Sequence, residues 1–303
     1  MGAKKLPYLS LNEYFRNKFK KRVQRITVSL PFKCPHGACS YCLDGSAPHD
    51  SGTFVPLKRQ IEDGIINARR RYGKDTAFFV YFQSYTNTND TAENLKKHFD
   101  SVLDYSDVIG ISVGTRPDCV PPEIIRLLMS YAEKGVETWV ELGLQSANDD
   151  TLKKVNRGHT AAQFSEAVRD LKKAGLFVMC HMIAGFPWET REDVLKTAKL
   201  AASSGCDAIK IHPLHLLSGT PLADQYRRED FRLLGLDEYV KLLADIIEIL
   251  PPEIVVARFT AEGRKDRLIA PDYCSPHFKP VIKQMLIDEM TQRGSSQGCR
   301  SKG

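Results

Sequence analysis

Six stretches rich in β-branched and aromatic residues recur along the chain, and each is followed by an amphipathic segment of helical period. Their starts are roughly 30 to 50 residues apart, the length of a strand, a helix and two loops. The pattern therefore predicts consecutive crossover units and a parallel, barrel-like sheet rather than a sandwich. The predicted strands are Ile26–Leu30, Ala77–Phe82, Val108–Val113, Glu137–Leu142, Leu176–Ile183 and Asp207–Ile211.

Proline and glycine punctuation agrees with this period. Pro121 and Pro122 precede a predicted helix over Glu123–Glu133, which Gly135 ends, and Gly175 and Gly205 end the next two helices. Farther along, the pattern predicts a helix near Asp237–Leu250, a strand near Ile254–Phe259 and a final helix after Pro280. No low-complexity linker interrupts the chain, so we expect one barrel domain over 26–275. We expect the basic segment 1–25, and the tail from Gly294 within a C-terminal helix and tail over 276–303, to be peripheral.

Composition is that of a globular protein, with 42% hydrophobic and 26% charged residues among 303. No apolar run approaches the roughly 20 residues of a membrane span, and the first residues carry no targeting pattern, so we expect a cytoplasmic protein without a membrane partner. The net charge of +6 is modest but locally concentrated over Arg16–Arg25 and at Arg69–Arg71. Such patches are compatible with a polyanionic partner without proving one.

Polar residues gather directly after the predicted strands. In parallel α/β barrels the carboxyl ends of the strands carry the active site, although loops are polar in any case. The segments concerned are 83–89, 115–118, 143–146, 185–190 and 212–220.

Three of the eight cysteines, Cys34, Cys39 and Cys42, fall in the loop after the first predicted strand, within FKCPHGACSYCLDG. Three thiolates on one loop can surround a metal centre. An iron–sulfur cluster held by three thiolates keeps one iron open to another ligand. Zinc usually needs a fourth protein ligand, which His36 or His49 could supply, and buried unliganded thiols are the third reading.

Several further segments match a known family, and the likeness covers nearly the whole chain. They are YFQSYTNTND, ISVGTRPDCVP, ELGLQSANDDTLKKVNRGHT, HMIAGFPWET, IKIHPLHLLSGTPLA and APDYC. With the cysteine triplet, they resemble the radical S-adenosylmethionine (SAM) enzymes. The resemblance is to the YhcC/YtqA (MnmL-type) group, which is related to the catalytic subunit of Elongator.

The resemblance implies an α/β fold, a partial (β/α)6 TIM-like barrel of parallel strands with the cluster loop after the first strand. It also implies that Cys34, Cys39 and Cys42 ligate a [4Fe–4S] cluster whose remaining iron binds SAM. The spacing C-x4-C-x2-C departs from the common C-x3-C-x-aromatic-C and looks shortened against the YhcC/YtqA group, which puts the path of the loop in question.

The SAM contacts implied by the same resemblance fall in three segments. Tyr41 occupies the aromatic position whose backbone borders the adenine. In the second segment, Gln145 and Ser146 of the GLQS turn, with Arg157, match residues that position the methionine part; an arginine fork suits a carboxylate. In the third, Ile183, Gly185 and Glu189 match an adenine-side pattern, for which a helix-start turn is the alternative.

The group's association implies a tRNA substrate: a wobble uridine whose C5 carboxymethylaminomethyl side chain is processed toward aminomethyl. A reducing partner such as flavodoxin or ferredoxin would supply the electron. Two rivals stay open, a radical SAM enzyme acting on a small molecule or peptide, and a zinc-binding barrel protein without radical chemistry.

Other polar residues have simpler readings. We expect His181, His212 and His215 to be hydrogen-bonded at strand ends rather than to be metal ligands, and Cys119, Cys180, Cys206 and Cys274 to be core or near-core thiols. We expect Cys299 to lie in a disordered tail. Glu141 and Asp118 could manage protons but have no stronger signal. Phe15 and Phe19, four apart among basic residues, predict a helix that contacts nucleic acid or docks on the barrel.

Overall fold

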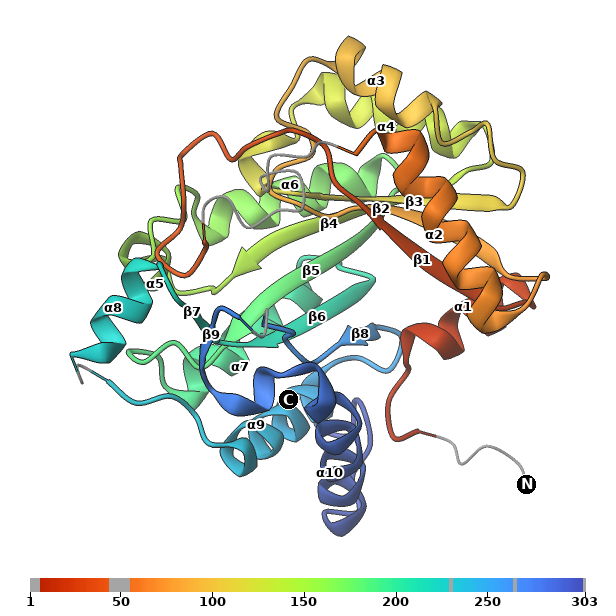
Figure 1. Cartoon of the computed structure of the whole chain (residues 1–303). Helices are drawn as coiled ribbons and strands as arrows, with labels where there is room; N and C mark the ends of the chain where they lie inside the picture. The colour runs from red at the N-terminus through yellow and green to blue at the C-terminus, as the bar shows by residue number, and fades with distance from the viewer. Residues whose placement is uncertain (1–5, 44–54, 229–230, 264–265, 302–303) are drawn as a thin grey trace.

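The computed structural model describes residues 6–43, 55–228, 231–263 and 266–301. Seven parallel strands form one curled sheet in the order β1-β2-β3-β4-β5-β6-β8, an α/β half-barrel (Figure 1). Their bounds are β1 Val23–Val28, β2 Ala77–Phe82, β3 Val108–Thr115, β4 Glu137–Gln145, β5 Phe177–Ala184, β6 Ala208–Pro213 and β8 Val255–Arg258. A separate antiparallel pair joins β7 (Leu216–Leu217) to β9 (Leu268–Ala270).

Helices connect successive strands and cover the outer face of the sheet (Figure 1). The longer ones are α2 Leu57–Tyr72, α3 Ala92–Asp100, α4 Pro122–Glu133, α6 Ala161–Lys173, α7 Arg191–Ser203, α9 Leu236–Ile249 and α10 Lys279–Gln292. The short helices α5 (Asp149–Lys154) and α8 (Pro221–Arg227) lie at the carboxyl end of the strands. Thr160 and Thr190 begin α6 and α7 with capping boxes, which satisfy backbone N–H groups of the first turn. In the described part of the chain no helix combines the length and apolarity that crossing a membrane requires.

The predicted α/β architecture is confirmed, and the sheet contains one strand more than the six of the partial (β/α)6 barrel. β2 has the predicted bounds, and β3 to β6 differ from prediction by three residues or fewer at either end. β1 begins three residues earlier than predicted. The glycines predicted to end helices, Gly135, Gly175 and Gly205, all have positive φ, at 82°, 72° and 95°, which suits a residue without a side chain.

The amino end of the barrel is closed by an apolar layer to which the N-terminal helix α1 (Leu11–Phe19) contributes. Phe15 of α1 is 3% exposed, and its ring stacks on Trp139 of β4 with centroids 5.3 Å apart. The layer, called the floor below, consists of Phe15, Val23, Ala77, Phe79, Trp139, Met179, Ala208 and Val255. The helix predicted around Phe15 and Phe19 therefore docks on the barrel, so the described residues of segment 1–25 are not peripheral, contrary to the expectation.

The C-terminal tail is also docked, contrary to the expectation of disorder. Gln297 is buried and its amide donates to the carbonyls of Pro251 and Ile254 at 2.8 and 2.7 Å, while its Oε1 accepts from the N–H of Leu9 at 2.8 Å. These bonds satisfy backbone groups at the start of β8 and before α1. Cys299 is exposed within this ordered tail. The proposed division of the chain into 1–25, 26–275 and 276–303 stays a prediction.

Candidate functional site

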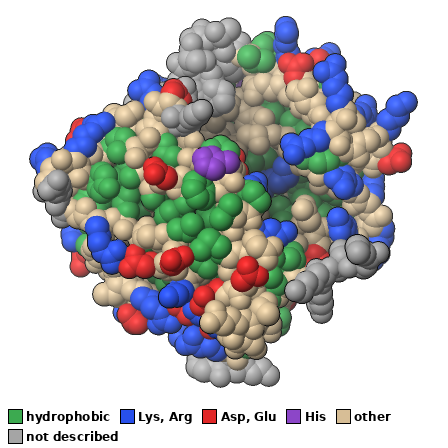
Figure 2. Space-filling model, turned by 60° about the horizontal axis from the view of Figure 1, so that its bottom comes forward, with side chains coloured by type: hydrophobic (Ala, Val, Ile, Leu, Met, Phe, Trp, Pro, Cys, Tyr) green, Lys and Arg blue, Asp and Glu red, His purple; other side chains and the backbone are tan. Residues whose placement is uncertain are grey.

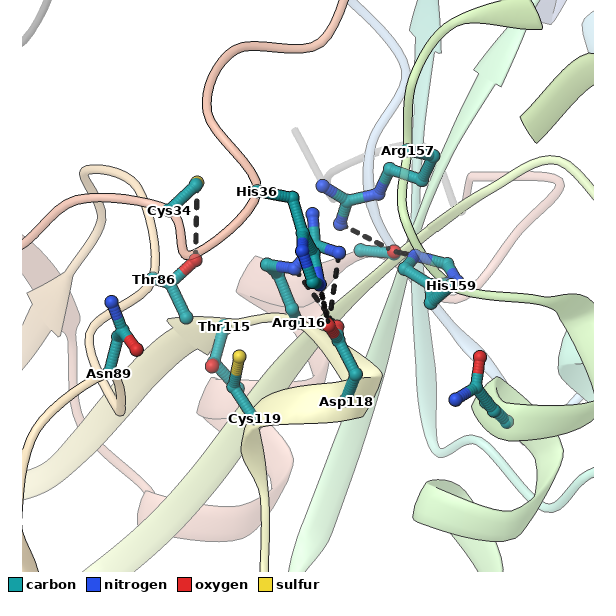
Figure 3. Close-up of polar contacts among 12 residues, drawn as sticks. Cys34, His36, Thr86, Asn89, Thr115, Arg116, Asp118, Cys119, Arg157 and His159 are labelled. Carbon is teal, nitrogen blue, oxygen red and sulfur yellow. Dashed lines mark hydrogen bonds and ion pairs between the residues drawn. The ribbon is translucent and has the colours of Figure 1, made fainter. Parts of the chain in front are cut away.

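The three clustered cysteines lie in the loop after β1, at the carboxyl end of the sheet. Cys39 is buried, Cys34 is half-buried and Cys42 is exposed. The Cys34 thiol accepts a hydrogen bond from Thr86 Oγ1 at 3.2 Å, as Figure 3 shows, and Arg157 Nη1 lies 3.8 Å from Cys39 Sγ. The Cys34 and Cys39 sulfurs thus face donors from the segments that follow β2 and α5.

Backbone and amide hydrogen bonds hold this loop to segments far away in the sequence. Asn89 Nδ2 donates to the carbonyl of Lys33 at 2.9 Å, and Asn156 Nδ2 donates to that of Ala38 at 3.2 Å. Ser40 donates through its N–H to Val155 and accepts from Leu222, both at 3.0 Å. The path of the loop is therefore fixed by hydrogen bonds before the triplet and within it.

Arg157 connects the cysteine loop to the end of β4. It is 6% exposed, and its Nη2 donates to the carbonyl of Gly143 at 2.8 Å. Burial alone would lower the pKa of Arg157, but Tyr41 and Cys39 beside it outweigh burial and raise it. The guanidinium is therefore a permanent positive charge next to the cysteine sulfurs.

Gly143 leaves room for that guanidinium. A Cβ at this position would lie 2.4 Å from Arg157 Nη2 and 2.6 Å from Gln145 Nε2, closer than real contacts allow. Gln145 itself has a φ of 72°, the left-handed region that side chains rarely adopt. The GLQS turn is thus shaped around Arg157 at the mouth of the barrel.

The turn continues to Ser146, whose hydroxyl donates to Glu189 Oε1. Burial raises the pKa of Glu189, and its Oε2 has no hydrogen-bond partner among the described residues. Glu189 belongs to the segment after β5 that contains Gly185, with a φ of +98°. The second and third predicted SAM-contact segments therefore meet at Ser146 and Glu189.

Tyr41, from the cysteine loop, packs over this same segment. Its ring centroid lies 6.0 Å from that of Phe186, and both belong to an apolar cluster with Ile183. The Tyr41 hydroxyl is buried without a hydrogen-bond partner among the described residues. The structure thus brings Tyr41 and the other predicted site residues to the carboxyl end of the sheet.

A second ionic group beside the loop was missed by the sequence reasoning. Arg116, 1% exposed, donates through Nε and Nη2 to the two oxygens of Asp118 at 2.9 and 3.1 Å (Figure 3). Asp118 Oδ2 also lies 2.9 Å from His36 Nε2. The one signal in the sequence was an arginine and an aspartate two residues apart directly after β3.

These contacts change the reading of Asp118. Burial would raise the pKa of Asp118, but the hydrogen bonds and charge of Arg116 outweigh it and lower the pKa. A carboxylate held in this way is a poor proton donor near neutral pH, so the suggestion that Asp118 manages protons is not supported.

Four other cysteines and the candidate zinc ligands His36 and His49 complete the set of predicted metal-binding or thiol residues. Cys119, Cys180, Cys206 and Cys274 are buried, as predicted, and burial raises the pKa of Cys119 to about 11. Within residues 6–43, 55–228, 231–263 and 266–301, no three His, Cys, Asp or Glu side chains converge as donors to one metal ion, and this includes the three clustered cysteines. His36 faces Asp118, and His49 lies outside the described residues.

Comparison with protein families identifies the superfamily of the chain. The model described as "Radical SAM superfamily" matches residues 28–201, more than half of the chain. The chain belongs to the radical SAM superfamily. The model described as "Radical_SAM C-terminal domain" matches residues 206–288, so the superfamily match continues through α9 and most of α10. The enzyme class that the sequence resemblance implied is confirmed.

Three individual relatives are similar to the chain over half of its length or more. The chain is 37% identical over 299 residues to the uncharacterized protein YtqA of Bacillus subtilis, covering 96% of this chain and 92% of that protein. It is 30% identical to the protein YhcC of Escherichia coli, covering 93% and 92%. A tRNA uridine(34) acetyltransferase of Dehalococcoides mccartyi is 31% identical over 172 residues, 53% of this chain and 36% of that one.

A solved structure supports the fold. The Elp3 of Methanocaldococcus infernus superposes with a TM-score of 0.73 at 18% identity, covering 91% of this chain and 64% of that one. This likeness confirms the curled half-barrel.

Proposed function

We propose that the chain reductively cleaves SAM at a [4Fe–4S] cluster held by Cys34, Cys39 and Cys42. When bound, the cluster would supply an electron to the sulfonium of SAM and so produce a 5′-deoxyadenosyl radical that abstracts a hydrogen atom from the substrate. The observation that carries the proposal is the position of Arg157, whose guanidinium lies between Cys39 Sγ and the carbonyl of Gly143.

The types of side chain around the cysteine loop fit these groups. The three thiols are free of disulfides and sit on one loop, and thiolates are the usual ligands of iron–sulfur clusters. Several buried polar atoms around them lack partners among the described residues, namely Ser40 Oγ, Tyr41 Oη, Arg157 Nε and Glu189 Oε2. Because buried polar groups are nearly always satisfied, these atoms support a polar ligand at this position.

The predicted SAM residues would divide between the methionine part and the adenine. Arg157 would pair with the carboxylate of the methionine part, while Gln145 and Ser146 would line the same side of the turn. Tyr41, Ile183 and Gly185 would border the adenine, the glycine allowing the backbone to approach the base. Glu189, whose hydrogen bond fixes Ser146, would position rather than contact the reacting atoms.

For the substrate, we propose the wobble uridine of tRNA, with processing of a C5 carboxymethylaminomethyl side chain toward aminomethyl. The support comes from relatives named as tRNA uridine(34) acetyltransferases and from the fold shared with Elp3. A flavodoxin or ferredoxin would serve as reductant.

The basic stretches do not add direct support for this substrate at the mouth. Arg16–Arg25 lies on α1 and the start of β1, and Arg69–Arg71 ends α2, so both are at the amino end of the strands. Figure 1 shows α1 on the opposite side of the sheet from α5 and α8. A tRNA that uses them must extend along the flank of the barrel while its anticodon reaches the cysteine loop.

The test is anaerobic reconstitution of the full chain, followed by reaction with SAM, a reductant and tRNA from a strain lacking the gene. We expect 5′-deoxyadenosine and a change of the wobble nucleoside to appear together, both lost in Cys39→Ala. Formation of 5′-deoxyadenosine without any nucleoside change would overturn the tRNA assignment and favour a small molecule or peptide. No iron in oxygen-free protein would overturn the radical mechanism.

A further inference from the structure

One layer of side chains inside the barrel is polar, and it lies between the floor and the cysteine loop. Glu141 of β4 follows the floor residue Trp139 by two positions and precedes Gly143 by two. Since alternate residues of a strand share a face and rise about 7 Å per pair, Glu141 lies one layer beneath the carbonyl that Arg157 binds. The same layer contains Arg25, Tyr81, Ser112, His181 and Lys210, from five other strands.

Among the described residues, Glu141 is the single carboxylate at the centre of this polar layer. Its side chain is fully buried, and one oxygen accepts from Arg25 Nη2 and Ser112 Oγ. The other oxygen accepts from Lys210 Nζ and lies 2.6 Å from His181 Nε2. Burial would raise the pKa of Glu141, but Arg25 and Lys210 outweigh it and hold the pKa well below its usual range. Glu141 is therefore ionised and fully occupied by donors.

Two cations face this one carboxylate. The Arg25 guanidinium and the Lys210 ammonium lie over the Tyr81 ring, 3.9 and 4.3 Å from its centroid. Arg258 of β8 also acts on Lys210, but it has its own partner, Glu262 Oε1, at 3.2 Å. With Lys210 protonated, the polar layer therefore holds two positive charges and only the one negative charge of Glu141. The layer lacks one negative charge, and an uncompensated charge inside a protein is costly.

The titratable neighbours do not correct this imbalance. Burial lowers the pKa of His181 to about 4, and burial and Arg258 hold that of His212 well below its usual range, so both rings are neutral. Burial and Arg25 lower the pKa of Lys210 to about 7 in spite of Glu141. Near neutral pH Lys210 is therefore protonated in only part of the molecules, and an added anion would stabilise the protonated form.

Solvent reaches the polar layer from the hollow of the barrel. The side chains of Arg25 and His181 are 15% and 20% exposed, and Arg25 Nε has no hydrogen-bond partner among the described residues. Thr27, two residues beyond Arg25 on β1, is exposed. Figure 2 shows one face of the molecule hollowed, with Lys and Arg side chains in and around the hollow.

We propose that Arg25 and Lys210 form a subsite for an anionic group of the substrate, a carboxylate or a phosphate, beneath the cysteine loop. Glu141 positions the two cations, and the entering anion supplies the missing negative charge. The proposal rests on the proposed function in placing the substrate inside the barrel. In that substrate the anion is either the carboxylate of the C5 side chain or a phosphate of the target nucleotide.

The first test uses small anions without RNA. The full chain, reconstituted anaerobically and labelled with 15N-lysine, is titrated with inorganic phosphate and with acetate, and the Lys210 signal is assigned by Lys210→Met. We expect either anion to raise the Lys210 pKa by about 1 unit, and Lys210→Met to weaken anion binding about ten-fold or more. A Lys210 titration that neither anion moves overturns the proposal.

Opposite effects of two variants separate a subsite from a structural network. Removing the internal carboxylate by Glu141→Gln should preserve or strengthen anion binding, while Lys210→Met weakens it. Equal weakening in both contradicts the subsite. If Lys210→Met does not fold, Arg25→Lys takes its place, because it keeps the positive charge but loses the planar fork of the guanidinium. Arg25→Lys should weaken anion binding several-fold. Unchanged anion affinity in this variant overturns the proposal.

The second test identifies the source of the anion. Anticodon stem-loops carrying carboxymethylaminomethyluridine or aminomethyluridine are compared for binding to the wild type and Lys210→Met. Loss of affinity for the first RNA alone assigns the carboxylate, and equal loss for both assigns a phosphate. If neither RNA binds while phosphate still raises the Lys210 pKa, the tRNA assignment fails and the subsite stands. If each RNA binds the wild type and Lys210→Met with equal affinity, Lys210 does not contact the RNA and the proposal is overturned.

Discussion

Arg157 and Cys39 are 118 residues apart in the sequence, yet the guanidinium Nη1 of one lies 3.8 Å from the sulfur of the other. A buried guanidinium requires a compensating negative charge, and a thiolate metal ligand would supply it. Together with the bond from Nη2 to the carbonyl of Gly143, this contact ties the end of β4 to the loop after β1, so that Arg157 and the cysteine triplet share one support.

Replacing Arg157 tests that support. Arg157→Lys keeps the charge but cannot reach both Gly143 and Cys39 with a planar fork, so we expect SAM affinity to fall about ten-fold while the iron content is retained. Equilibrium binding of SAM to reconstituted protein, with iron analysis, measures both. Arg126→Lys, exposed on α4, is the matched control and should match the wild type. Unaltered SAM affinity in Arg157→Lys would contradict the assignment.

The cysteine ligands are tested by Cys39→Ala. We expect the iron content and its visible absorption to be lost together with 5′-deoxyadenosine formation, because two thiolates cannot hold the cluster as three do. Cys299→Ala removes an exposed thiol of the C-terminal tail and should retain both. Turnover of SAM by Cys39→Ala at the wild-type rate would refute the ligand set.

The lack of space for a side chain at Gly143 predicts that a substitution there disturbs Arg157. Gly143→Ala would place a Cβ 2.4 Å from Arg157 Nη2, so the guanidinium must move or the strand must shift. We expect SAM affinity to fall at least ten-fold and stability to fall by about 1–3 kcal/mol. Gly235→Ala is the control, because its Cβ would meet Glu238 at an ordinary 3.5 Å. Calorimetric binding and urea unfolding distinguish the two variants.

The Arg116–Asp118 pair predicts a pH-dependent stability. The pKa of Asp118 is lower in the folded state than in the unfolded chain, so its contribution is complete above about pH 4 and is lost as the pH falls below that value. Asp118→Asn leaves Arg116 buried without its counter-ion and should cost about 3 kcal/mol at pH 7.

Urea unfolding of cluster-free protein at pH 7 and at about pH 3.5 measures this difference. The gap between the wild type and Asp118→Asn in the free energy of unfolding should narrow at the lower pH, because Asp118 of the unfolded chain takes up a proton there before the folded protein does. Asp288→Asn, exposed on α10, should show no gap at either pH. A gap that stays constant with pH would show that the charge of Asp118 is not the cause.

The floor predicts a loss of stability far from the cysteine loop. Phe15→Ala removes a ring that contacts Phe79 and Trp139 with centroids 5.3 Å from each, and should cost about 3–5 kcal/mol. Phe19→Ala, from a half-buried position on the same helix, should cost less. Chemical unfolding of the cluster-free chain measures both, and equal losses would show that Phe15 has no special place in the floor.

Periodicity was sufficient for the strands because a parallel strand buried on both faces forms a short apolar run that glycine and proline delimit. AFFVYF of β2 is such a run, and every residue in it is buried. For β1 the predicted bounds were shifted, because Arg25 and Thr27 point into the barrel. These two polar residues interrupt the apolar run in the sequence, so that only the outward-facing residues of the strand are left to indicate it. The charge of Arg16–Arg25 likewise concealed that Phe15 belongs to the core.

For the site, motifs located the cysteines and the residues expected to contact SAM. They could not locate the Arg116–Asp118–His36 group or the polar layer. These contacts depend on which face each residue of a strand presents and on the register between strands. Glu141 meets Lys210 and Arg25 only because β1, β4 and β6 curl toward one another.

The docking of α1 also bears on the order in which the chain assembles during synthesis. During synthesis Phe15 leaves the ribosome more than a hundred residues before its partner Trp139 and the neighbouring Phe177. The first helix must therefore wait, with its aromatic face uncovered, until the middle of the sheet exists. The lysines and arginines around it keep that waiting segment soluble.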